Sequence, residues 1–150
     1  MSKAWVIDAC VAAKWWLSDE EHIAEAAQVL KAIREGIIEP AVPDLWFYEL
    51  ANVLVLACRR KRLTREQAQA FALEGKAMPV LAFPVHEKLS RILELASQYS
   101  LSAYDAAYVA LAESLGCRLL TADDSLFESV SGKCPFVHHL RETRRLFRIK

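Results

Sequence analysis

Glycine and proline are scarce in this 150-residue chain, which has four glycines and five prolines. Such low numbers exclude collagen-like repeats and Gly/Ser linkers, and the chain has no internal repeat or low-complexity tract. No position therefore suggests where a second domain would begin, and we expect residues 1–150 to form a single domain. The apolar fraction of 54% is enough to fill one core at this length.

Cysteines are also few, and none of the four belongs to a Cys-x-x-Cys pair. Each lies in or beside an apolar stretch, which is typical of buried thiols in a reduced, cytoplasmic protein. The apolar residues 4–17 are interrupted by Asp8 and Lys14 and are followed by no small-residue cleavage site, so they do not predict a signal peptide. No apolar run reaches transmembrane length, and we expect no membrane partner.

Excess charge of either sign is absent, because 19 basic residues balance 19 acidic ones. No global field would attract nucleic acid or a membrane, so an anionic partner would have to meet a local basic patch. Within the basic residues 59–65, Arg59, Arg60 and Arg62 are candidate contacts for nucleic-acid phosphates. Alternatively, they only stabilise the C-terminal end of a helix through its dipole.

Strand-like runs alternate with helix-like periods along the chain. Apolar, β-prone runs predict strands at residues 4–7, 37–42, 80–83, 118–121 and 136–138. Helical periodicity with start and stop signals predicts helices at residues 20–34, 45–62, 64–76, 87–99, 103–115 and 123–129. Alternating strands and helices form parallel sheets through right-handed crossovers. We therefore predict the α/β class, with a mostly parallel central sheet of four to five strands and helices on both faces.

Acidic residues follow two of the predicted strands. Asp8 ends the first strand, and Asp123 follows the strand at residues 118–121 after one intervening alanine. In an open α/β sheet, ligands bind beyond the carboxyl ends of the strands, where these two carboxylates would lie. Each aspartate could equally serve only as the N-cap of the next helix.

Two further acids lie on predicted helices. Glu49 shares a helical stripe with apolar residues, and an unpaired carboxylate in such surroundings must be neutralised, paired or bound to a metal. Asn52 is a polar companion on the same face, although Glu49 could instead reach solvent at the helix rim. Asp105 lies three residues after Ser102, a spacing that also fits a capping box.

Taken together, the four acids point to a metal site. Carboxylates at the ends of separate elements on one parallel sheet suit a hard divalent cation such as Mg²⁺ or Mn²⁺. Without a cation they would repel one another, and their pKa values would rise. We expect the carboxylates of Asp8, Glu49, Asp105 and Asp123 to lie within about one coordination shell of one another.

Four segments, in order, resemble the motifs of PIN domains, and especially of the VapC-like toxins of type II toxin–antitoxin systems. They are residues 6–10 (VIDAC), 43–52 (PDLWFYELAN), 104–108 (YDAAY) and 121–123 (TAD). The resemblance spans almost the whole chain, and four motifs in order are far more specific than any single one. It implies the following catalytic and metal-binding acids: Asp8, Glu49, Asp105 and Asp123.

The resemblance also implies supporting residues and leaves two positions open. Thr121 would support the acids through its hydroxyl, and Asn52 matches the polar residue that the family has one turn after the glutamate. Cys10 stands where the family often has serine or threonine, so its supporting hydrogen bond would be weaker. Either Asp123 or the adjacent Asp124 could face the metal, and the spacing from Thr121 favours Asp123.

The resemblance implies a metal-dependent endoribonuclease that cleaves single-stranded or looped RNA with a metal-activated water. It also implies a homodimer and a small antitoxin protein whose C-terminal segment blocks the site. The alternatives are a PIN nuclease of RNA maturation or decay outside toxin–antitoxin systems, and a catalytically silent RNA-binding module, which would lack acids. A phosphoacceptor receiver domain fits poorly, because it needs an acid pair after its first strand, and Asp8 stands alone.

Overall fold

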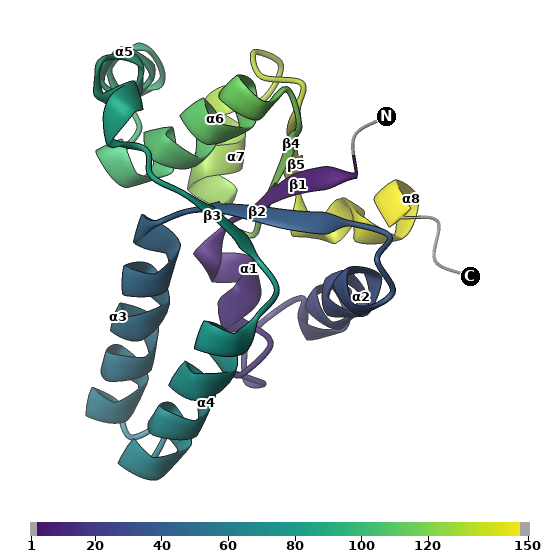
Figure 1. The fold of residues 1–150 in the computed structure, drawn as a ribbon, viewed down its shortest axis with the longest axis vertical. Helices are drawn as coiled ribbons and strands as arrows, with labels where there is room; N and C mark the ends of the chain where they lie inside the picture. The colour runs from purple at the N-terminus through teal and green to yellow at the C-terminus, as the bar shows by residue number, and fades with distance from the viewer. Residues whose placement is uncertain (1–2, 148–150) are drawn as a thin grey trace.

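The computed structural model describes residues 3–147, which contain one five-stranded sheet with the strand order β3-β2-β1-β4-β5 (Figure 1). Every neighbouring pair in this sheet is parallel. The predicted class and parallel sheet are therefore confirmed, and each predicted strand is present within two residues of its expected bounds. The strands are β1 (Ala4–Ile7), β2 (Glu39–Pro43), β3 (Leu81–Phe83), β4 (Arg118–Thr121) and β5 (Val137–His139).

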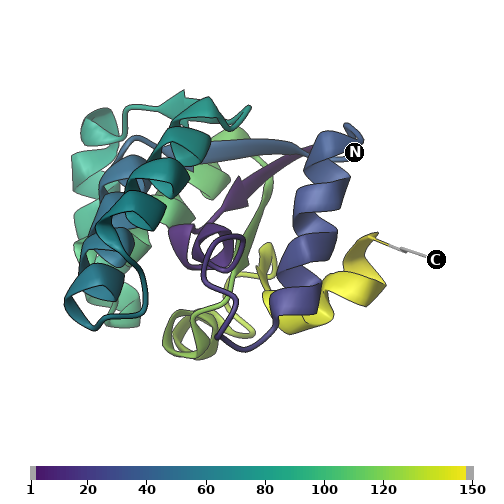
Figure 2. The same cartoon turned by 90° about the horizontal axis from the view of Figure 1, so that it is seen from below.

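Helices cover both faces of the sheet, with α2 and α8 on one side and α3 and α4 on the other (Figure 2). Single 3₁₀ turns at His86–Lys88 and Leu140–Glu142 complete the regular structure. The α-helices are α1 (Ala9–Ala13), α2 (Ile23–Arg34), α3 (Leu45–Arg59), α4 (Arg65–Ala77), α5 (Leu89–Tyr99), α6 (Ala103–Leu115), α7 (Asp124–Val130) and α8 (Thr143–Phe147). Within residues 3–147, none of them combines the length and the apolar character that a membrane span requires.

The period-two alternation of the strands divides the core into two clusters. In β1, Val6 packs with the cluster beneath α3, α5 and α6, whereas Trp5 and Ile7 pack with the cluster beneath α2. Leu119 and Leu120 of β4 divide in the same way. Because successive strand side chains point to opposite faces, these runs are apolar throughout, as expected for strands covered on both sides.

Helix bounds differ from the sequence prediction where the backbone turns locally. The helix predicted from residue 20 begins only at Ile23, since His22 adopts a left-handed conformation with φ of 58°. The helix predicted to reach residue 62 ends at Arg59, because Lys61 also takes a positive φ of 58°. The short α1 was not predicted, because most of its five residues are buried and it has no amphipathic pattern to detect.

The burial of α5 predicts a sharp contrast between two leucines on this helix. Leu95 is 1% exposed and Leu93 is 68% exposed. We expect Leu95→Ala to lower the free energy of unfolding by about 2–5 kcal/mol, because it leaves a cavity in the core. Leu93→Ala, the matched control with the same helix propensity, should change it by about 0.5 kcal/mol or less. Urea unfolding measures both, and equal losses would contradict this packing.

Candidate active site

The carboxyl ends of two adjacent strands bring Asp8 and Thr121 together. Ile7 of β1 pairs with Leu120 of β4, so the next residue of each strand reaches the same edge of the sheet. There the Thr121 hydroxyl donates a hydrogen bond of 2.8 Å to Asp8 Oδ2. Both side chains are buried, with 5% of Asp8 and none of Thr121 exposed. This contact is of the kind that the resemblance implied for Thr121.

Asp8 and Asp123 also cap helices, so the N-cap role that was the alternative for each residue is confirmed. Asp8 Oδ1 accepts from the Cys10 N–H at 3.4 Å at the beginning of α1. Asp123 Oδ1 accepts from the Leu126 N–H at 3.1 Å at the beginning of α7. Thr121 Oγ1 in turn accepts from the Asp123 N–H at 3.0 Å. Capping orients one oxygen of each carboxylate and does not remove either residue from the site.

Cys10 occupies a position within this network. Its Sγ lies 3.6 Å from Thr121 Oγ1 and accepts from the Ala122 N–H at 3.3 Å. Burial, followed by the negative charge of Asp8, raises the pKa of the Cys10 thiol, so the sulfur stays protonated. A thiol is a weak donor, and the long contact agrees with the weaker support expected from cysteine at this position.

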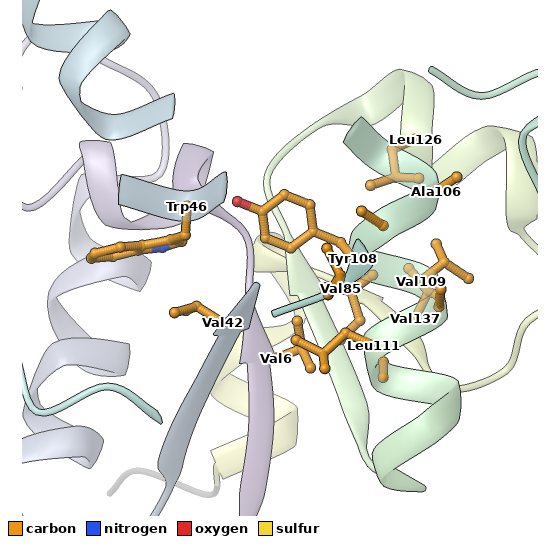
Figure 3. Packing of buried hydrophobic residues seen from close by; sticks show 14 of the residues in the cluster. Val6, Val42, Trp46, Val85, Ala106, Tyr108, Val109, Leu111, Leu126 and Val137 are labelled. Atoms are coloured by element: carbon orange, nitrogen blue, oxygen red, sulfur yellow. The ribbon is translucent and has the colours of Figure 1, made fainter. Parts of the chain in front are cut away.

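Glu49 is positioned by a residue that the sequence analysis missed. The Tyr108 hydroxyl donates to Glu49 Oε1 at 2.7 Å and accepts from the Ala9 N–H at 3.3 Å. The Tyr108 ring is fully buried in the core, and its hydroxyl lies on the side towards Trp46 (Figure 3). Asn52, the expected polar companion of Glu49, is exposed and lines the same surface hollow as Glu49. A tyrosine within the apolar α6, one turn after Asp105, was the available signal, since a buried hydroxyl needs a partner.

Asp105 lies in the first turn of α6, where Ser102 is the N-cap. Ser102 Oγ accepts from the backbone N–H of Asp105 at 3.0 Å, so this cap does not depend on the aspartate side chain. Burial, then the charge of Asp123, raises the pKa of Asp105, and a hydrogen bond from Ser102 partly offsets the rise. The Asp105 carboxylate therefore interacts electrostatically with the Asp123 carboxylate.

Mutual repulsion connects all four acids. The pKa of Asp8 is raised from 3.8 to about 7: burial is the largest cause, the charges of Glu49 and Asp105 add to the rise, and the Thr121 hydrogen bond opposes it. Burial, and to a lesser extent the charge of Asp105, raises the pKa of Glu49. The structure thus brings Asp8, Glu49 and Asp105 within electrostatic range of one another, and Asp123 within range of Asp105.

The stricter expectation of one shared coordination shell is not met. Within residues 3–147, no three His, Cys, Asp or Glu side chains form a ready-made metal site. Hydrogen bonds from Thr121 and Tyr108 each hold one oxygen of Asp8 and of Glu49, and like charges repel one another without a cation between them. The donor set nevertheless fits a hard divalent cation, because it consists of carboxylate oxygens, and a cation would lower the raised pKa values of Asp8, Glu49 and Asp105.

Asp124, the alternative to Asp123, faces another part of the molecule. Its Oδ1 lies 2.8 Å from His139 Nε2 and 3.8 Å from Arg141 Nη1. The contact with His139 does not have the geometry of a hydrogen bond. The Asp124 side chain is 70% exposed. Asp123, by contrast, is the aspartate whose charge acts on Asp105. The geometry therefore favours Asp123 as the site residue, as the spacing did.

The predicted basic contacts divide into two groups. Arg62 donates to Asp19 through Nε at 2.9 Å and through Nη2 at 2.6 Å, and Nη2 also reaches Glu20 at 3.2 Å. These ion pairs occupy the donors that were assigned to phosphates, so Arg62 leaves the set of candidate RNA contacts. Arg59 and Arg60 are exposed and remain candidates.

Removal of the Tyr108 hydroxyl should affect both stability and Glu49. Tyr108→Phe leaves Glu49 Oε1 and the buried Ala9 N–H without this partner, so we expect about 1–3 kcal/mol less free energy of unfolding. The pKa of Glu49 should rise, since this hydrogen bond lowers it. Urea unfolding and an NMR titration of the Glu49 carboxyl measure the two effects. Tyr104→Phe, at a 66% exposed ring on the same helix, is the control. Equal changes in unfolding free energy and in the Glu49 pKa for the two variants would contradict the Tyr108 hydrogen bonds to Glu49 and Ala9.

Asp8 should make the cation-free protein less stable as the pH rises. Between its ordinary pKa of 3.8 and its value of about 7, the folded state binds more protons than the unfolded chain. The free energy of unfolding should therefore fall across this window, by at most about 4 kcal/mol. Asp8→Asn removes this contribution. The free energy of unfolding of the variant should therefore increase relative to that of the wild type from pH 4 to pH 8. Urea unfolding in the presence of a chelator tests this, and parallel curves for the two proteins would contradict it.

Comparison with known proteins agrees with this geometry. A family model described as PIN domain matches residues 5–133. Ribonuclease VapC9 of Mycobacterium tuberculosis is 35% identical to this chain over 130 residues, which cover 87% of this chain and 94% of that protein.

Solved structures share the fold. The crystal structure of PAE2754 from Pyrobaculum aerophilum matches with a TM-score of 0.69 at 25% identity, covering 98% of this chain and 90% of that one. A chain of a toxin–antitoxin complex from Klebsiella pneumoniae matches with a TM-score of 0.63 at 20% identity, covering 90% of this chain and 96% of that one. Since the family model spans most of the sequence and VapC9 aligns along nearly all of its own length, this chain belongs to the PIN-domain family.

Proposed function

We propose that this protein is a metal-dependent endoribonuclease that hydrolyses RNA phosphodiester bonds, and that it is the toxin of a toxin–antitoxin pair. The observation that carries the proposal is the set of mutually repelling carboxylates at the carboxyl ends of β1 and β4 and on α3 and α6. The 35% identity to Ribonuclease VapC9 supports RNA as the substrate.

The cation would be held by Asp8, Glu49, Asp105 and Asp123, and Mg²⁺ and Mn²⁺ are the ions that such oxygen donors prefer. When bound, it supplies a water of lowered pKa and neutralises charge on the phosphate.

The residues of the chain itself orient these acids. Thr121 fixes Asp8 through Oδ2, the first turn of α7 fixes Asp123 through Oδ1, and Tyr108 fixes Glu49 through Oε1. Glu49 Oε2 is then the oxygen that the Tyr108 hydrogen bond leaves available to the cation.

Two protein partners are part of the proposal. The likeness to a chain of the Klebsiella toxin–antitoxin complex supports a small antitoxin protein. A homodimer is supported by large apolar side chains that are exposed on the edge strand β3 and on α5, namely Leu81, Leu89 and Leu93. A cytoplasmic location is supported by four free cysteines, which a reducing compartment maintains.

Cleavage of a mixed RNA pool with Mg²⁺ or Mn²⁺ tests the function, and Asp105→Asn tests the site. The amide removes a charge, while the Ser102 cap persists because it uses the backbone N–H. We expect cleavage to fall about 100-fold or more, since even loss of a ligand's hydrogen-bond partner costs about 10–100-fold. The melting temperature of the cation-free protein should stay unchanged or rise, because repulsion is relieved.

Asp124→Asn is the matched control, because the Asp124 carboxylate lies beside His139 and Arg141. It should cleave RNA at nearly the wild-type rate. Wild-type activity in Asp105→Asn would remove Asp105 from the site. An RNA pool left intact by the wild-type protein with either cation would overturn the proposed function.

A further inference from the structure

A hollow of about 560 Å³ adjoins the acid site and is lined by aromatic, aliphatic, amide and carboxylate side chains. Glu49 belongs to this lining, so the hollow opens beside one of the proposed metal ligands. The other residues that line it are Leu45, Tyr48, Asn52 and Tyr104.

Two tyrosine rings in this lining are unusually exposed. Tyr48 is 77% exposed and Tyr104 is 66% exposed, although large aromatic rings normally contribute to a core or an interface. Each ring directly precedes an acid in the sequence, Tyr48 before Glu49 and Tyr104 before Asp105. Neighbouring residues on a helix project about 100° apart, so each ring lies beside its carboxylate without sharing its direction.

The charge around the hollow determines what can occupy it. Phosphates are repelled by the acids, and the lining contains no lysine or arginine. The nearest exposed arginine on α3 is Arg59, ten residues after Glu49, or about 15 Å further along the helix axis. An RNA strand beside the acids would therefore gain little affinity there from its backbone. Its bases are the part that this lining can bind, because every base has a face that stacks on an aromatic ring.

We propose that this hollow is a subsite for one unpaired nucleobase of the RNA, next to the cleaved phosphodiester bond. Tyr48 and Tyr104 provide the stacking surfaces, and the exposed Asn52 amide, which both donates and accepts hydrogen bonds, contacts the edge of the base. A base reaches such a subsite only outside a duplex, in agreement with the single-stranded or looped RNA that the family resemblance implies as substrate. This inference rests on the proposed function.

Binding of a fluorescein-labelled 12-nucleotide oligo(A) RNA, followed by anisotropy with Ca²⁺ as the cation, tests the subsite directly. We expect Tyr48→Ala and Tyr104→Ala each to weaken binding about 10-fold, in line with loss of stacking on one base. Tyr48→Phe and Tyr104→Phe keep the rings and should bind like the wild type. An abasic oligomer of the same length should bind the wild type and both alanine variants equally weakly, and duplex A₁₂·U₁₂ should show no dependence on the rings.

Steady-state cleavage separates this inference from the proposed function. The alanine variants should raise KM more than they lower kcat, because stacking contributes to substrate binding. If the wild type cleaves RNA and both alanine variants show unchanged KM and oligo(A) binding, the subsite is wrong and the nuclease stands. If the wild type cleaves nothing yet binds oligo(A) through the rings, the proposed nuclease function is wrong, and the hollow binds a base without serving cleavage.

The same rings could instead belong to a surface between two copies of the chain. Sedimentation of Tyr48→Ala and Tyr104→Ala distinguishes this case. Conversion of a dimer to a monomer with unchanged oligo(A) binding would overturn the subsite. Unchanged melting temperatures are expected, since both rings are exposed, and they establish that weaker binding is not a folding defect.

Discussion

The cost of keeping a negative charge on buried Asp8 is the constraint on which the site depends. Burial is the largest cause of the rise in its pKa, and the hydrogen bonds from the side chains of Thr121 and Cys10 partly offset it. The first of these bonds requires β1 and β4 to be adjacent and in register, because Thr121 reaches Asp8 only when Ile7 pairs with Leu120. The strand order therefore supports the chemistry of the site as directly as it supports the core.

A second bond connects the core to the spacing of the acids. The Tyr108 ring packs among apolar side chains (Figure 3). Its hydroxyl joins Glu49 on α3 to the Ala9 N–H at the beginning of α1. Ala9 is the residue after Asp8, so one buried side chain determines how Glu49 sits relative to Asp8. Substitutions that disturb the packing around this ring would change the distance between Glu49 and Asp8 as well as the stability of the fold.

Local sequence signals predicted the strands and the acids, but each signal had two meanings. Asp8 and Asp123 follow strands and precede helices, and the structure shows that both do cap those helices. Contacts between residues far apart in the sequence distinguish a helix-capping role from a role in the site. Such contacts cannot be predicted from the periodicity of the sequence. The Tyr108 bond to Glu49 is one such contact, and the pairing of Arg62 with Asp19, which removed Arg62 from the predicted RNA contacts, is another. The short α1 was missed for a different reason, since five residues that are mostly buried give no periodic pattern.

The balance of charge explains why such a site would favour contact with bases over contact with phosphates. The chain is neutral overall, the four site acids lie within electrostatic range of one another, and one candidate basic contact, Arg62, is already paired with carboxylates. Cation binding would neutralise the repulsion at the cleaved bond, but its effect falls off within about 8–10 Å at physiological salt. Neighbouring nucleotides would then depend on uncharged contacts, and exposed aromatic rings beside two of the acids, at Tyr48 and Tyr104, offer these without adding charge. An acidic site on a neutral protein can in this way bind RNA, a polyanion, through its uncharged bases.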